Sequence, residues 1–171
     1  RDSGDQTTAA ALVYLAEILG GSGATSVLGT ELQFDTQQAI YTSAYYGGTA
    51  LDNTTFGLIA VPVPGVSLQQ VEDAMDAAIA KFMATGINIE TFERIKMQMR
   101  ASEIYAMDNV EGIANRYGAA LTQGLTIADV QEWPRILQEV TPDEVMVAAR
   151  LVFDQKASVT GWLMGPQEEL K

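Results

Sequence analysis

The chain has 171 residues, 47% of them hydrophobic, and it carries 22 acidic against 10 basic residues, for a net charge of −12. This length fits one domain, and the apolar content is enough for a buried core. The negative charge argues against nucleic acid and anionic membrane surfaces as partners, because both require a basic protein face.

The sequence contains neither histidine nor cysteine. It therefore supplies no histidine general base, no thiol nucleophile and none of the His or Cys ligands that usually hold zinc. No apolar run approaches the roughly 18–20 residues that a membrane span needs. The chemistry left to the chain rests on carboxylates, hydroxyls, amides and a few Lys and Arg side chains.

The first third of the chain predicts two helices and two strands. Residues 7–20 place apolar side chains three and four positions apart, which is typical of a helix, and Gly20 and Gly21 end it. A short helix is expected over 26–35. Residues 38–47 and 54–63 are rich in β-branched and aromatic residues and predict two antiparallel strands.

The rest of the chain is predicted to be helical up to a final strand. Ser67 and Gln70 form a capping box, and Thr141 followed by Pro142 is a strong helix start. We expect helices over 67–85, 89–107, 109–124, from Thr126 with an interruption around Pro134, and 141–153. Residues 157–164 are expected to form a last strand.

Segregated helices and strands indicate an α+β fold. We expect residues 1–171 to form a single domain. Three strands are few for so many helices, and the chain begins with Arg1 rather than Met. We therefore expect that the N-terminal strands of the sheet are missing.

Residue chemistry alone gives no active site. The Gly-rich loop over 20–26 follows a helix and not a strand, which favours a helix-ending turn over a phosphate site. Adjacent carboxylates lie at helix starts or at the chain end, where acids stabilise the helix dipole or are solvated (Glu72 and Asp73, Asp143 and Glu144, Glu168 and Glu169). Tyr41 and Tyr45 are expected on one face of their strand and Tyr46 on the other.

Several motifs, taken in order, resemble the non-catalytic half of the pitrilysin (insulinase-like) metallopeptidases, in the bacterial branch that is similar to mitochondrial processing peptidase. A helix ending in Leu19-Gly20-Gly21 is followed by Glu31-Leu32 and by a strand ending in Val-Pro-x-Pro-Gly65. The segments Tyr117-Gly-Ala-Ala-Leu-Thr, Val140-Thr-Pro-Asp-Glu and Ser158-Val-Thr-Gly follow in the expected order. The resemblance covers about residues 9–165.

The resemblance implies an inactive half-unit of α+β fold, with a mainly antiparallel sheet backed by helices on one face. This half-unit is expected to close like a clamshell against a homologous zinc-bearing half. Zinc is then expected in the partner half, on an inverted H-x-x-E-H motif, and not in this chain. The partner half would lie in the same or a separate polypeptide, and an extended peptide would be the substrate.

The resemblance also implies one substrate-binding residue. In many relatives the second half contributes an Arg after Glu-Leu and a Tyr at the next strand to peptide binding. Here Gln33 follows Glu31-Leu32, and Tyr41 corresponds to the Tyr with a spacing about one residue longer. We expect Tyr41 to bind substrate, and no catalytic or metal-binding residue in this chain.

The favoured function is that of a non-catalytic domain of a bacterial zinc metallopeptidase, which pairs with the zinc-bearing half to enclose peptide. One alternative is a non-proteolytic core or scaffold subunit of the same family. A second alternative is an unrelated peptide-binding module.

Overall fold

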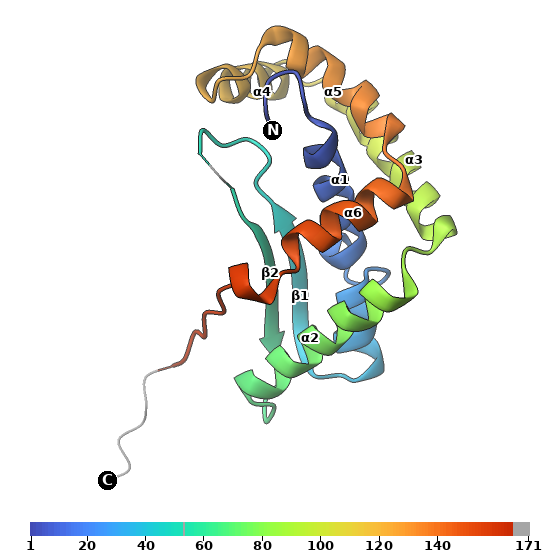
Figure 1. Ribbon diagram of the computed structural model, residues 1–171, viewed down its shortest axis with the longest axis vertical. Helices are drawn as coiled ribbons and strands as arrows, with labels where there is room; N and C mark the ends of the chain where they lie inside the picture. Colours follow the sequence, from blue (N-terminus) through green and yellow to red (C-terminus); the bar gives the residue numbers. More distant parts are fainter. Residues whose placement is uncertain (53, 166–171) are drawn as a thin grey trace.

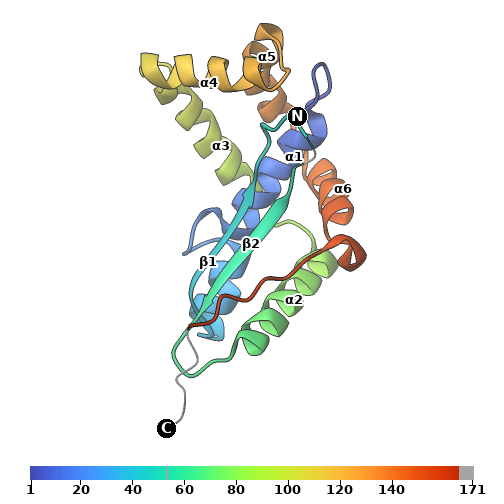
Figure 2. The ribbon, with the colours of Figure 1, turned by 90° about the vertical axis from the view of Figure 1, so that its left-hand side faces the viewer.

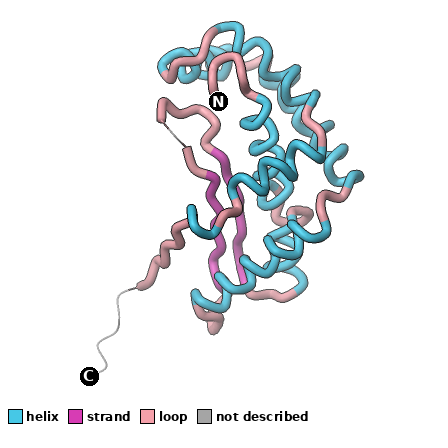
Figure 3. The backbone as a smooth tube through the Cα atoms, in the orientation of Figure 1, coloured by secondary structure: helices cyan, strands magenta, loops and turns pink. Residues whose placement is uncertain are grey.

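The computed structural model describes residues 1–52 and 54–165. Figure 1 shows a two-stranded sheet along one side of the molecule and helices on the other, and Figure 3 shows the same separation by element type. The elements in chain order are α1 (Thr7–Ala16), η1 (Glu17–Gly21), η2 (Gly29–Asp35), β1 (Ala39–Tyr46), β2 (Phe56–Pro62), α2 (Leu68–Thr85), α3 (Ile89–Ala106), α4 (Val110–Thr122), α5 (Ile127–Glu139), α6 (Pro142–Val152) and η3 (Gln155–Ala157).

Helix α1 lies at the centre of the main core. Most of its residues are buried, as expected for a helix that is apolar on nearly all sides. Tyr14 is fully buried, packs against Phe92 with 5.1 Å between ring centroids, and donates a hydrogen bond of 3.0 Å to the carbonyl of Leu137. This one side chain therefore connects α1 with α3 and α5.

The π-helical turn η1 continues α1 and brings the chain against the sheet. A Cβ added at Gly20 would lie 2.1 Å from the backbone nitrogen of Ala44, so only glycine fits at this contact. The predicted helix end at Gly20 and Gly21 is confirmed, and the contact explains why the sequence places glycine there.

Strands β1 and β2 form an antiparallel hairpin, as predicted. Their inward-facing side chains pack on the helices, and the pairs are Thr42 with Ala60, Ala44 with Leu58, and Tyr46 with Phe56. The other face carries no helix in the described part of the chain (Figure 2). The helices thus back the sheet on one face, which confirms the α+β prediction.

Side-chain caps define most helix starts as the sequence predicts. Ser67 and Thr141 each accept a hydrogen bond from the backbone N–H three residues later, and each is part of a complete capping box. Asn88 and Asn109 cap α3 and α4 in the same way. The positive φ of Gly86, +77°, ends α2 where the sequence indicates.

The predicted interruption around Pro134 is wrong, because α5 runs from Ile127 to Glu139 with Pro134 inside it. Proline removes one backbone donor and disfavours a helix interior. Here Trp133, Ile136 and Leu137 pack on the main core, and this burial holds the helix on both sides of the proline.

The predicted final strand at 157–164 is also wrong. The chain makes the short turn η3 and then continues through 158–165 without strand pairing. Figure 2 shows this segment crossing the molecule on the β2 side of the hairpin. A β-rich sequence forms a strand only when another strand supplies ladder partners, and the described residues place none beside it.

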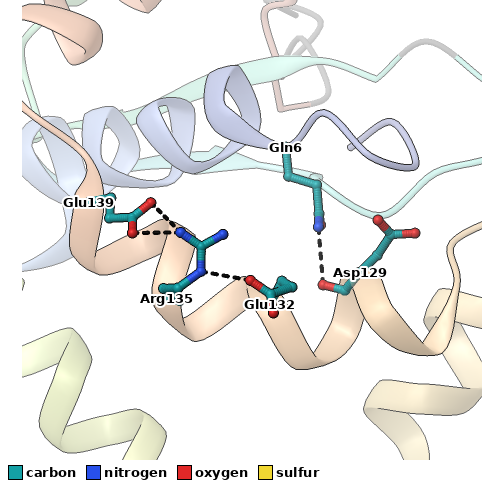
Figure 4. Close-up of polar contacts among 5 residues, drawn as sticks. All are labelled: Gln6, Asp129, Glu132, Arg135 and Glu139. Atoms are coloured by element: carbon teal, nitrogen blue, oxygen red, sulfur yellow. Dashed lines mark hydrogen bonds and ion pairs between the residues drawn. The ribbon is translucent and has the colours of Figure 1, made fainter.

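Asp129 joins the N-terminal segment to α5. Its carboxylate accepts hydrogen bonds from the Ser3 hydroxyl at 2.8 Å, from the Gly4 N–H at 2.9 Å, and from the N–H and hydroxyl of Thr126. Gln6 donates to the Asp129 carbonyl at 3.0 Å (Figure 4). These bonds hold the pKa of Asp129 well below its usual range, the Thr126 hydroxyl having the largest effect.

On the same helix, Arg135 pairs with Glu132 and Glu139, as Figure 4 shows. The pKa of Arg135 is raised, first by its hydrogen bond to Glu132 and then by that to Glu139.

No helix of the described residues is both long enough and apolar enough to cross a membrane.

Candidate functional site: the outward face of the hairpin

The outward face of the β1–β2 hairpin exposes apolar and aromatic side chains from both strands. Tyr41 and Tyr45 on β1 are 52% and 50% exposed, and Ile59 and Val61 on β2 are 44% and 39% exposed. Tyr41 lies opposite Val61 in the ladder, and Tyr45 lies opposite Gly57. We call these four exposed side chains the outer face, and it is a surface of the kind that marks binding sites.

Tyr41 lies at a β-bulge. The register changes between Ala39 and Tyr41, so β1 carries one residue more than β2 at this point. Ile40 and Tyr41 are consecutive and both are more than half exposed. The bulge therefore presents two neighbouring side chains to solvent at the start of the strand, which a regular strand would not do.

The three strand tyrosines lie as the sequence predicts. Tyr41 and Tyr45 share the outer face, whereas Tyr46 packs on the main core. Burial raises the pKa of Tyr46, followed by a smaller effect of Asp2. Tyr41 is thus exposed enough to contact a bound peptide, and its role in substrate binding stays a prediction.

Gln33, which stands where many relatives are expected to place Arg, is used within the chain. Its side-chain amide donates a hydrogen bond of 2.6 Å to the hydroxyl of Thr42, which is only 3% exposed. This bond satisfies a buried polar group on the inward side of β1. Gln33 therefore supports the strand that carries Tyr41 and brings no charge to the surface.

Beside η2 lies a shallow depression of about 220 Å³ between that turn and the start of α3. Glu31 and Lys81 form an ion pair at its wall, and the pKa of Lys81 is raised, first by the hydrogen bond to Glu31 and then by the charge of Glu31. Each charge thus neutralises the other. Neither Tyr41 nor Gln33 lines this depression.

The carboxylate pairs from the sequence are not brought together into a site. Glu144 belongs to the capping box of α6, and Glu72 accepts a hydrogen bond of 2.8 Å from the Trp162 indole. Glu168 and Glu169 lie outside the described residues. Among the residues the structure describes, no three His, Cys, Asp or Glu side chains are grouped to hold a metal ion.

Sequence reasoning missed two features. Residues 58–61 of β2 are all apolar (Leu58, Ile59, Ala60 and Val61). Because successive strand residues point to opposite faces, this run could have indicated an apolar outer face as well as an apolar inner one. Thr126 and Asp129 have capping-box spacing, but their link to Ser3 and Gly4 spans about 125 residues and has no local signal.

Comparison with known proteins gives one family and several similar folds. Residues 2–99 match the family described as Peptidase M16 inactive domain. A search of curated proteins gives no match.

Three crystal structures have the same fold. A protease from Helicobacter pylori superposes with a TM-score of 0.79 at 18% identity, over 89% of this chain and 36% of that one. The peptidase M16 inactive domain from Pseudomonas fluorescens superposes with a TM-score of 0.76 at 17% sequence identity. The match covers 89% of this chain and 36% of that one. A third match is the inactive peptidase domain of a protein described as a zinc protease from Bordetella parapertussis. It superposes with a TM-score of 0.77 at 13% sequence identity, over 91% of this chain and 83% of that one.

The chain thus spans about a third of the Helicobacter and Pseudomonas proteins, and at these identities the similarity establishes the fold alone. The family match is stronger evidence than the similar folds, because it covers more than half of the 171 residues. The chain belongs to the peptidase M16 inactive-domain family.

Proposed function

We propose that this chain is the non-catalytic half of a zinc metallopeptidase, which pairs with a zinc-bearing half and helps to enclose and bind an extended peptide. In this proposal residues 1–171 act as one inactive half-unit. The zinc and its general base belong to the partner half, and this chain contributes surface and backbone contacts.

One observation carries the proposal: a member of the peptidase M16 inactive-domain family presents an exposed apolar sheet face. An extended peptide matches such a surface, since its backbone can pair with a strand and its alternate side chains can contact the sheet. A protein without catalytic groups can support hydrolysis in this way by positioning the substrate.

Tyr41 is the residue that we propose to contact the peptide. Its spacing from Glu31-Leu32 exceeds the family pattern by about one residue, and the β-bulge before it adds one residue to β1. The bulge therefore compensates for the longer spacing and supports the correspondence. Tyr41 is half exposed, and its phenol hydroxyl can donate a hydrogen bond to a peptide carbonyl at the start of the strand.

The test compares peptide hydrolysis by the zinc-bearing half mixed with wild-type chain or with Tyr41→Phe. We expect the variant to raise KM about five- to tenfold with little change in kcat, because one hydrogen bond is worth about 1 kcal/mol. Tyr105→Phe is the matched control, since Tyr105 is 77% exposed on α3 and lies outside the outer face. Equal KM values for Tyr41→Phe and the control would show that the Tyr41 hydroxyl does not bind the peptide.

A further inference from the structure

Helix α3 exposes an apolar stripe on the side of the molecule away from the hairpin (Figure 1). Met97 is 73% exposed, Ile104 59% and Met107 66%. Met97 and Ile104 are seven residues apart, as are Arg100 and Met107. The four side chains therefore lie along one face of the helix, which we call the α3 stripe. The buried Phe92 of α3 lies on the other face and packs in the main core.

A shallow depression of about 270 Å³ lies between the α3 stripe and α5. Its walls include Arg100, Ile104 and Met107 on α3, and Pro134 and Gln138 on α5. Neighbouring exposed apolar side chains beside a groove mark an interaction site, and Met and Arg are enriched where proteins contact one another. Unbranched methionine side chains also adapt easily to the surface of a partner.

Arg100 is the charged member of the α3 stripe. Among the residues that the structure describes it makes no ion pair, whereas the nearby Arg116 and Arg135 each pair with acids of this chain. Glu103, one helical turn from Arg100, accepts a hydrogen bond of 2.7 Å from Arg116 through its Oε2 atom. Its Oε1 atom accepts none within the described part of the chain. An unpaired cation and a half-used carboxylate thus lie within one turn of α3.

The α3 stripe is self-complementary for two helices that pack antiparallel. The pair Met97 and Met107 has the same midpoint in the sequence as the pair Arg100 and Ile104. If a second α3 packs on the first about a two-fold axis at that midpoint, Met97 meets Met107 of the second copy. Arg100 then meets Ile104 of the second copy with its aliphatic stem, and its guanidinium comes within reach of the adjacent Glu103.

We propose that two copies of this chain associate through the α3 stripe, with the two α3 helices antiparallel and each Arg100 paired with Glu103 of the other copy. Two-fold symmetry repeats every contact, so the exposed Met97, Ile104 and Met107 of both copies are covered together. The hairpin lies on the opposite side of the molecule (Figure 1), so this association leaves the outer face open and goes beyond the proposed function without depending on it.

The first test measures the mass of the 171-residue chain by sedimentation equilibrium over a range of concentrations. We expect a dimer that forms as the concentration rises. Arg100→Glu should raise the Kd of the dimer about tenfold or more, because each symmetric contact then brings two carboxylates together. Arg150→Glu is the matched control, since it changes the net charge equally at an exposed position on α6, and it should change the Kd less than about twofold.

A mixing experiment tests the contact between Arg100 and Glu103 itself. Glu103→Arg alone should also weaken the dimer, because two guanidinium groups then meet at each contact. An equal mixture of the Arg100→Glu and Glu103→Arg variants should associate about as tightly as the wild type, since both contacts of the mixed pair again join opposite charges. Circular dichroism of each variant checks that both keep the helix content of the wild type.

A further substitution tests the apolar part of the α3 stripe without altering the ion pair. Ile104→Asp should raise the Kd of the dimer about tenfold or more, because it places a charge in the covered surface. Val147→Asp is its control, since Val147 is 62% exposed on α6, away from the α3 stripe.

A chain that remains monomeric at every concentration would overturn the proposal. So would Arg100→Glu and Ile104→Asp variants that dimerise as tightly as their controls, or a mixture of the two folded charge variants that fails to associate. Each of these results leaves peptide binding at the outer face and pairing with a zinc-bearing half standing, because neither of them uses the α3 stripe.

Discussion

Tyr45 and Gly57 lie opposite each other across β1 and β2, and the phenol ring of Tyr45 occupies the space that a Cβ on Gly57 would need. Such a Cβ would lie 2.2 Å from Cζ of the ring. An aromatic ring over a strand glycine compensates for the missing side chain and fixes the register of the pair.

Gly57→Ala should therefore displace the Tyr45 ring and destabilise the protein. We expect a loss of about 0.2–1 kcal/mol in the free energy of unfolding, the usual range for one cross-strand contact, because the atoms that must move are the far end of a half-exposed side chain. The loss can be measured by urea titration. Gly118→Ala is the control, because no heavy atom lies within 4 Å of its added Cβ and alanine favours the helix α4. Equal stability of the two variants would show that the contact between Tyr45 and Gly57 does not contribute to the free energy of unfolding.

Tyr14→Phe should cost about 1–2 kcal/mol at pH 7, since the buried Leu137 carbonyl loses its side-chain donor. Burial, and secondarily the charge of Glu93, raise the pKa of Tyr14 to about 12. The unfolded chain releases this proton near pH 10, so the native state is the more protonated one between pH 10 and 12. The contribution of protonated Tyr14 to the free energy of unfolding is thus fully present below about pH 10 and is lost as the pH rises towards about 12.

In Tyr14→Phe this alkaline loss should become smaller, which urea midpoints at pH 8 and pH 11 will show. Tyr105→Phe should lose as much stability at pH 11 as the wild type does, because Tyr105 is exposed. An alkaline loss of the same size in Tyr14→Phe and in the wild type would contradict the assignment of this titration to Tyr14.

Asp129→Asn should remove a pH-dependent part of the stability. The pKa of Asp129 is depressed in the folded state, so the unfolded chain binds the proton first as the pH falls. The carboxylate therefore stabilises the protein fully above about pH 4, and this contribution is lost as the pH falls further towards the folded pKa.

We expect Asp129→Asn to be less stable than the wild type at pH 6 and closer to it at pH 3, measured as urea midpoints at both values. Asp108→Asn, which alters an exposed acid in the turn after α3, should follow the wild type at both. The same difference at both pH values would show that the hydrogen bonds of Asp129 do not depend on its charge.

Local signals in the sequence predict the helix boundaries and the hairpin well. Ser67, Asn88, Asn109, Thr126 and Thr141 each precede a helix, and each accepts the capping hydrogen bond that its residue type indicates. These signals involve residues three or four positions apart, which is why a single sequence contains them.

Features that depend on distant parts of the chain could not be predicted. Residues 157–164 have a strand composition, but only the position of neighbouring strands decides whether they pair. Pro134 remains in α5 because Trp133 and Leu137 pack on the core. The outer face combines a predictable and an unpredictable feature. Strand periodicity predicts that Tyr41 and Tyr45 share one face, whereas no local signal predicts the bulge that exposes Ile40 beside Tyr41.

We propose that this chain supports proteolysis without catalysing it. The most direct measurement is the zinc content and the peptide-hydrolysis rate of the purified chain, alone and after mixing with the zinc-bearing half. We expect the chain alone to bind no stoichiometric zinc and to show no hydrolysis, and hydrolysis by the zinc-bearing half to increase when the chain is added. Chelator-sensitive hydrolysis by the chain alone, or no effect of the chain on its partner, would contradict the account.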